Sequence, residues 1–211
     1  RVSKAFIRAI PGVDDYAILG KAWFHTTEEK HGRPLWDTIV FDMPASGHSI
    51  SMLKIPSVIV STVPDGPLTR DAKTVQTLLR DPARTSTVLV TLAEEMPVNE
   101  CRELAHTLES TLAIHPTVVV ANQVYPNRFA HGSIAGRVLD RLDQPASPPL
   151  RPLVEHAHLH AARSRLHAHY LAFLREHMRA PVVELPMLFR GALGPADIAE
   201  LGAVLSGSAA R

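Results

Sequence analysis

The stretch Thr38-Ile39-Val40-Phe41-Asp42-Met43-Pro44-Ala45-Ser46-Gly47-His48 decides how this sequence is interpreted. The run from Trp36 to Phe41 ends in apolar, β-branched residues, which is typical of a strand buried on both faces. An aspartate directly after such a strand, here Asp42, more often forms a turn or caps a helix. It also occupies the place of a Walker B carboxylate, which holds Mg²⁺ beside nucleotide phosphates. Gly47 would let the backbone approach a phosphate closely, so both interpretations stay open.

Strand-like and helix-like stretches alternate along the rest of the chain. Residues 87–92, 117–121 and 181–185 are short, β-branched and nearly continuous in apolarity. Helical patterns cover residues 14–24, 69–79, 99–112, 156–177 and 195–205. This alternation predicts an α/β fold with a largely parallel sheet flanked by helices, in which ligands bind beyond the carboxyl ends of the strands.

Composition narrows the classes of function. The 211 residues are 45% hydrophobic and 20% charged, which predicts one ordinary globular domain over residues 1–211. The net charge is +1, from 22 basic and 21 acidic residues, so we expect no nucleic-acid partner. Cys101 is the single cysteine, which favours a reducing, cytoplasmic location. No apolar run approaches the roughly 20 residues that span a bilayer, so we expect no transmembrane segment.

Residues 39–53 resemble the switch II signature of the ArsA- and Get-type ATPases, whose usual form is Asp-Thr-Ala-Pro-Thr-Gly-His-Thr-Leu-Arg. Four further landmarks occur in the order expected for that family: residues 11–15, 94–100, 121–123 and 186–194. The chain is therefore similar to the C-terminal two thirds of an ArsA/Get-type (anion-transporting, arsenical pump-driving) P-loop ATPase. The resemblance implies the P-loop NTPase fold, with ATP or ADP and Mg²⁺ as ligands.

The resemblance also implies roles for single residues. Asp42 would be the catalytic carboxylate associated with Mg²⁺, and Gly47 and His48 would sense the γ-phosphate. Asn122 would read the adenine edge, since an amide offers both a donor and an acceptor. Four residues would pack against the base: Pro186, Met187, Leu188 and Phe189. Met43 replaces the usual Thr, and Pro44 stands one position earlier than the usual proline, which changes the geometry of the switch loop.

A glycine-rich Walker A loop is not found in the sequence. The only Gly-Lys pair is Gly20-Lys21, Asp15 stands where the first glycine of the motif belongs, and Ala22 replaces Ser or Thr. In the family this loop lies upstream of the segment that residues 11–15 match. We therefore expect an ATPase domain that is incomplete at its N-terminus, since Arg1 is not an initiator methionine, and a chain that is inactive alone.

Two alternatives remain open. The chain could be a noncatalytic subunit that pairs with a complete ATPase, or an interaction module in which Asp42 only caps a turn. The family implies a homodimer, or a heterodimer with a related ATPase. The client stays open: the pump's metalloid site needs several thiolates, and the carrier of membrane proteins needs a large helical subdomain. Between Leu53 and Asp81 we expect only a short helix.

Histidines are concentrated in one predicted helix, at positions 156, 158, 160, 167, 169 and 177. Histidines spaced i, i+4, such as His156 and His160, can bind Zn²⁺. The simpler interpretation is a solvated helix face, because no carboxylate or cysteine completes a ligand set. The leucines of this helix are predicted to be core contacts together with Phe173: Leu159, Leu166, Leu171 and Leu174.

Overall fold

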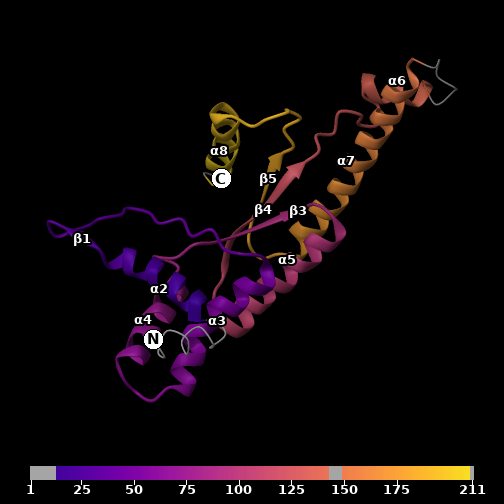
Figure 1. The fold of residues 1–211 in the computed structure, drawn as a ribbon. Helices are drawn as coiled ribbons and strands as arrows, with labels where there is room; N and C mark the ends of the chain where they lie inside the picture. The colour runs from indigo at the N-terminus through magenta and orange to yellow at the C-terminus, as the bar shows by residue number, and fades with distance from the viewer. Residues whose placement is uncertain (1–12, 143–148, 210–211) are drawn as a thin grey trace, which may run out of the picture. The chain divides into compact units, whose positions relative to one another are not determined.

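The computed structural model describes residues 13–142 and 149–209, which fall into two compact units (Figure 1). Unit 1 comprises the chain up to Thr87 together with Leu104–His115. Unit 2 comprises Val88–Glu103 and the chain from Pro116 onward. The landmark at residues 11–12 lies outside the described residues. None of the described helices has the length and apolarity needed to cross a bilayer.

Unit 1 is mainly helical. Its helices are α2 (Val13–Thr27), α3 (Ser46–Thr62), α4 (Pro67–Arg80) and the π-helical turn η1 (Leu108–Leu112). A small hairpin pairs β1 (Glu29–Lys30) with β2 (Arg33–Pro34). His31 and Gly32 form its turn with φ of 54° and 73°, as the favoured two-residue hairpin turn requires.

Helices α3 and α4 pack against each other, and their contact buries Met52 and Val75 beside Leu19. The amide of Gln76 donates to the Ser57 hydroxyl at 2.8 Å across the pair. The expectation of only a short helix between Leu53 and Asp81 is therefore wrong. Pro56 and the β-branched run around it argue against helix, but the packing of the Met52 face outweighs that local preference.

The predicted strand ending at Phe41 is also wrong. Residues 36–45 contain no strand, so they belong to neither of the described sheets. The side chains still alternate: Phe41 and Met43 pack on the core of unit 1, while Val40 is 90% exposed. Asp42, between the two inward residues, is consequently exposed.

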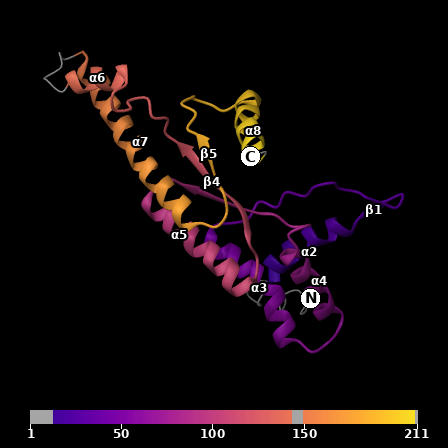
Figure 2. The same cartoon turned by 180° about the vertical axis from the view of Figure 1, so that it is seen from behind.

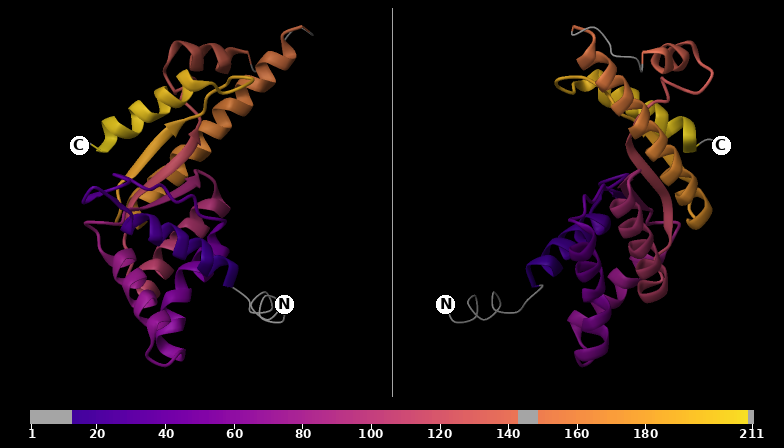
Figure 3. Two further views of the ribbon diagram at one scale, coloured as in Figure 1. Left: turned by 60° about the vertical axis from the view of Figure 1, so that its left-hand side comes forward. Right: turned by 90° about the vertical axis from the view of Figure 1, so that its right-hand side faces the viewer.

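Unit 2 contains the sheet, with strand order β3-β4-β5. The strands are β3 (Thr87–Leu92), β4 (Pro116–Val124) and β5 (Val182–Pro186), and β4 pairs with β5 in parallel. The helices are α5 (Glu95–Thr107, which ends in unit 1), α6 (Ile134–Arg141), α7 (Arg151–His177) and α8 (Pro195–Ala209). Helices α7 and α8 flank β4 and β5 on opposite sides (Figures 2 and 3). The predicted α/β fold with a parallel sheet flanked by helices is confirmed.

Helix α7 turns a regular stripe toward the sheet. Its buried residues recur at helical spacing: Ala161, Ser164, His167, Leu171 and Leu174. Leu171 and Leu174 join the core of unit 2, as predicted. Leu159 and Leu166 are exposed, so their prediction as core residues is wrong, and His167 is buried rather than on a solvated face. Leu159 and Leu166 are predicted as core residues because they are apolar, but they lie outside the buried stripe.

This stripe predicts unequal effects of two leucine substitutions in one helix. Leu174 is fully buried and Leu159 is 58% exposed. Leu174→Ala should lower the free energy of unfolding by about 2–5 kcal/mol, because it removes buried methyl groups and leaves a cavity. Leu159→Ala should change it by less than about 0.5 kcal/mol. Urea unfolding of both variants measures the difference, and equal losses would contradict the assignment of the stripe.

Candidate functional site

The predicted switch residues lie in one short stretch of unit 1. Asp42 makes no hydrogen bond or ion pair with another described residue, and its carboxylate is open to solvent. Gly47 and His48 occupy the first turn of α3. The amides of His48 and Ser49 both donate to the Ala45 carbonyl at 3.0 Å, which closes that turn. An accessible carboxylate therefore lies a few residues before a helix N-terminus.

This arrangement fits a hard cation that is shared with a phosphate. Mg²⁺ commonly takes one or two protein carboxylates, with phosphate and water oxygens completing its shell. The first turn of α3 contains no acidic residue that would repel an anion. Asp42 alone supplies a ligand but no enclosing cage.

The Gly20-Lys21 pair cannot act as a phosphate cradle. Both residues lie within α2, so their backbone N–H groups face along the helix rather than around a ligand. The Lys21 ammonium lies 4.8 Å from the centre of the Phe24 ring. No glycine-rich loop of the Walker A kind is present in residues 13–142 and 149–209.

The two predicted adenine elements meet in unit 2. Asn122 is half-buried in β4, where its Oδ1 accepts from the Gln123 amide at 2.9 Å. Gln123 adopts a φ of 55°, and the register of the β4–β5 pair shifts at this point. Beyond the shift Val124 pairs with Pro186, and the Met187 amide donates to the Val124 carbonyl at 2.9 Å. The chain after β5 therefore starts beside the end of the Asn122 strand.

Phe189, the last of the four predicted base-covering residues, contacts side chains of its own unit. Its ring meets Tyr125 edge-on at 5.1 Å between centroids and lies 5.6 Å from His160. The Arg128 guanidinium lies 5.5 Å from the Phe189 ring centre. Met187 and Leu188 are half-buried. Sequence reasoning missed Tyr125, which belongs to no motif, and it considered His160 only as a zinc ligand or as part of a solvated face.

His167 ties helix α7 to the end of β4. The Tyr125 amide donates to His167 Nδ1 at 3.1 Å, and the Tyr125 ring meets the imidazole at 5.3 Å. A backbone amide can only donate, so Nδ1 carries no proton and the neutral ring holds its proton on Nε2. His167 is 3% exposed. A second proton on this ring would break the bond to Tyr125.

The same burial determines how these histidines titrate. Burial lowers the pKa of His167 below its ordinary value of about 6.5; Glu94 acts in the opposite direction and Arg163 adds to the lowering. Burial, followed by Arg128, also lowers the pKa of His160. Glu94 and Arg163 form an ion pair of 3.1 Å, which limits the effect of either charge.

These shifts predict a loss of stability in acid. Because the folded pKa of His167 is lowered, the unfolded chain binds more protons below about pH 6.5, so stability is fully present above that pH and falls as the pH drops. His167→Gln, which keeps a hydrogen-bond acceptor but does not titrate, should flatten the loss between pH 7.5 and 5.5. His169→Gln, at an exposed position of the same helix, is the control. Urea unfolding at both pH values measures the slopes; parallel slopes for wild type and His167→Gln would contradict this assignment.

Metal-binding side chains do not gather elsewhere in the described chain. No group of three or more histidine, cysteine, aspartate or glutamate side chains there is placed to hold one ion. Cys101 is buried, and burial raises the pKa of its thiol to about 11. The histidines of α7 pack with aromatic rings instead: His160 also lies 5.6 Å from Phe129.

Comparison with known proteins shows which family the chain resembles. Residues 67–138 match the family model of the anion-transporting ATPases, which confirms the resemblance found in the sequence. A protein of Halobacterium salinarum that carries the name arsenical pump-driving ATPase is 25% identical over 181 residues, or 82% of this chain. The chain spans 24% of the length of that relative. The chain is therefore similar to the ArsA-type anion-transporting ATPases over these residues.

Proposed function

We propose that these 211 residues supply the switch and adenine-binding elements of an ArsA-type ATPase that hydrolyses Mg·ATP to change the conformation of a dimer. The observation that carries the proposal is the pairing of β4 with β5, which sets the Asn122 strand beside the start of the 186–189 segment. The match over residues 67–138 supports it. The phosphate cradle would come from outside the described residues, in the same polypeptide.

Each proposed role follows from the chemistry of the side chain. Asp42 would hold Mg²⁺, which when bound neutralises charge on the phosphates. Gly47, whose amide lies in the first turn of α3, and His48 would sense the γ-phosphate. The Asn122 amide would pair with the adenine edge, and the 186–189 segment would cover the base.

A noncatalytic subunit is the second candidate function. It is favoured by the position of Gly20-Lys21 inside α2, because the described chain then has no groups to enclose a β-phosphate. Such a subunit would retain Asp42 and Asn122 and would pair with a complete ATPase. Phosphate release by the 211-residue chain should be absent under either proposal. Sequencing the gene around the Arg1 codon distinguishes the two proposals. Only the first proposal requires a glycine-rich loop encoded in the same polypeptide.

Asp42 should make nucleotide binding depend on Mg²⁺. In the complete protein, Asp42→Asn should lower the affinity for Mg·ATP roughly tenfold and abolish most hydrolysis, because it removes the anionic ligand. Asp37→Asn, also exposed and five residues earlier, is the matched control and should change neither. Titration of fluorescent ATP with and without Mg²⁺ measures the effect. Asp42→Asn binding that equals wild type would remove the metal role.

Asn122 should control base selectivity. Asn122→Ala should weaken ATP binding roughly tenfold and reduce the preference for ATP over GTP, because the base loses a donor and an acceptor. Affinity for inorganic triphosphate should stay unchanged. Asn99→Ala, at a half-buried amide on α5, is the control. An unchanged ATP-to-GTP ratio in Asn122→Ala would contradict the adenine role.

A further inference from the structure

Unit 2 contains a pocket of about 330 Å³ that the nucleotide elements do not explain. It lies between α7 and the ends of β4 and β5, and Asn122 does not line it. Its walls are mostly apolar and include two proline rings, Pro126 and Pro186, with Val124 and Leu171. This volume is at the lower end of the range for small-molecule sites.

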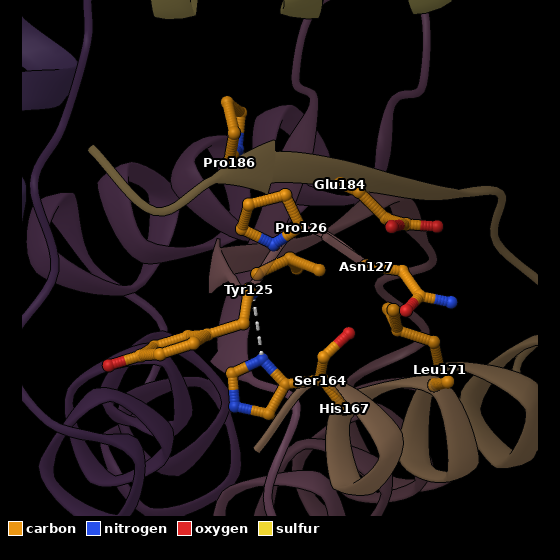
Figure 4. Close-up of a pocket in the computed structure, with 10 residues that line it drawn as sticks. Tyr125, Pro126, Asn127, Ser164, His167, Leu171, Glu184 and Pro186 are labelled. Atoms are coloured by element: carbon orange, nitrogen blue, oxygen red, sulfur yellow. Dashed lines mark hydrogen bonds between the residues drawn. The ribbon is translucent and has the colours of Figure 1, made fainter. Parts of the chain in front are cut away.

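One buried hydroxyl faces this space. Ser164 is 6% exposed, and Figure 4 shows its oxygen pointing between Pro126, Asn127 and Leu171. No hydrogen bond joins the Ser164 hydroxyl to another residue in the part of the chain that the structure describes. The Ser164 oxygen is not among the closed-off side-chain atoms of the described chain that lack a partner, so it stays accessible from the pocket and can donate to or accept from an occupant.

Two other helical serines donate their hydroxyl to a carbonyl in the preceding turn. Ser110 donates to the His106 carbonyl at 2.7 Å, and Ser51 donates to the Gly47 carbonyl at 3.1 Å, each to the residue four positions earlier. This back-bonding is the usual solution for serine within a helix. Ser164 departs from it and turns its hydroxyl to the pocket instead.

The charges around the pocket are already neutralised. Glu184 lines it, but its carboxylate is paired with Arg175. His167 lines it as a neutral ring whose Nδ1 is occupied by the Tyr125 amide. An ion entering the pocket would lose its hydration and find no free counter-charge. Ser164 and the amide of Asn127 are left as the polar groups for recognition.

We propose that this pocket binds an uncharged ring compound bearing one carboxamide or hydroxyl group. The ring lies against the two prolines and Leu171, and the polar group exchanges hydrogen bonds with Ser164 and Asn127. The pocket shares Pro186 with the segment proposed to cover the base, but it does not include Asn122.

Three isosteric probes test the neutral character of the ligand: benzamide, benzoate and benzamidine. Benzamide should bind to the full chain with a dissociation constant on the order of a millimolar, as expected for so few atoms. It should shift the amide NMR signals of Tyr125, Asn127 and Ser164. Benzoate and benzamidine should bind at least roughly fivefold more weakly, since each brings an unpaired charge. Tighter binding of benzamidine would show that Glu184 recognises cations and would overturn the proposal.

Two variants with matched controls test the residues. Ser164→Ala should weaken benzamide binding roughly fivefold, and Ser110→Ala should not. Ala168→Phe, at the rim of the pocket, should abolish binding, whereas Ala162→Phe on the same helix should leave it intact. Far-ultraviolet circular dichroism checks that each variant folds. If a variant does not fold, the benzamide-induced changes in the NMR signals of the wild-type chain test the proposal instead. Signal changes scattered over the surface, or absent at saturation, would overturn the proposal and leave a pocket that holds water.

A competition separates this site from the proposed function. Adenosine and ATP should not displace benzamide, because Asn122 lies outside the pocket. Displacement would make the pocket part of the nucleotide site and would overturn its independence. Failure of the complete protein to bind ATP would remove the proposed function and leave benzamide binding unaffected.

Discussion

The hydrogen bond from the Tyr125 amide to His167 is the contact on which the site region of unit 2 depends. It joins the middle of α7 to the first residue after β4, so helix position and strand end are fixed together. The Tyr125 ring then contacts both His160 and Phe189. Loss of this bond would free the Tyr125 backbone from α7, while the Met187 amide would still join the start of the segment after β5 to Val124.

The sheet of unit 2 was readable from sequence because all three of its strands are continuous apolar runs. The predicted bounds differ from those observed by at most three residues, although β3 leaves Val88 and Val90 on one face exposed. The stretch ending at Phe41 has the same composition but forms no strand. A stretch becomes a strand only when it pairs with a neighbouring strand, and the composition of one stretch does not show whether it has such a neighbour.

The candidate site could be predicted only in part, because local sequence does not report contacts with distant residues. Motif order located Asp42 and Asn122, since each motif is local in sequence. The contacts around His167 join residues about 40 positions apart, and no local pattern reports them. The helical stripe could have indicated His167, because it lies three residues after Ser164 and four before Leu171. A polar residue at a buried position of an amphipathic helix is overlooked when core residues are predicted from apolarity alone.

Charge pairing explains how α7 can contain so many ionisable groups and still pack on a sheet. Arg163 pairs with Glu94, and Arg175 pairs with Glu184, so the basic residues near the buried stripe are matched by acids from neighbouring elements. The buried imidazole between these pairs is then kept neutral by its hydrogen bond and by its burial. Neutral surroundings leave hydrogen bonding as the means of recognition in this part of the protein. The exposed carboxylate of Asp42, which no described cation balances, is the opposite case, and it is suited to a partner that brings its own positive charge.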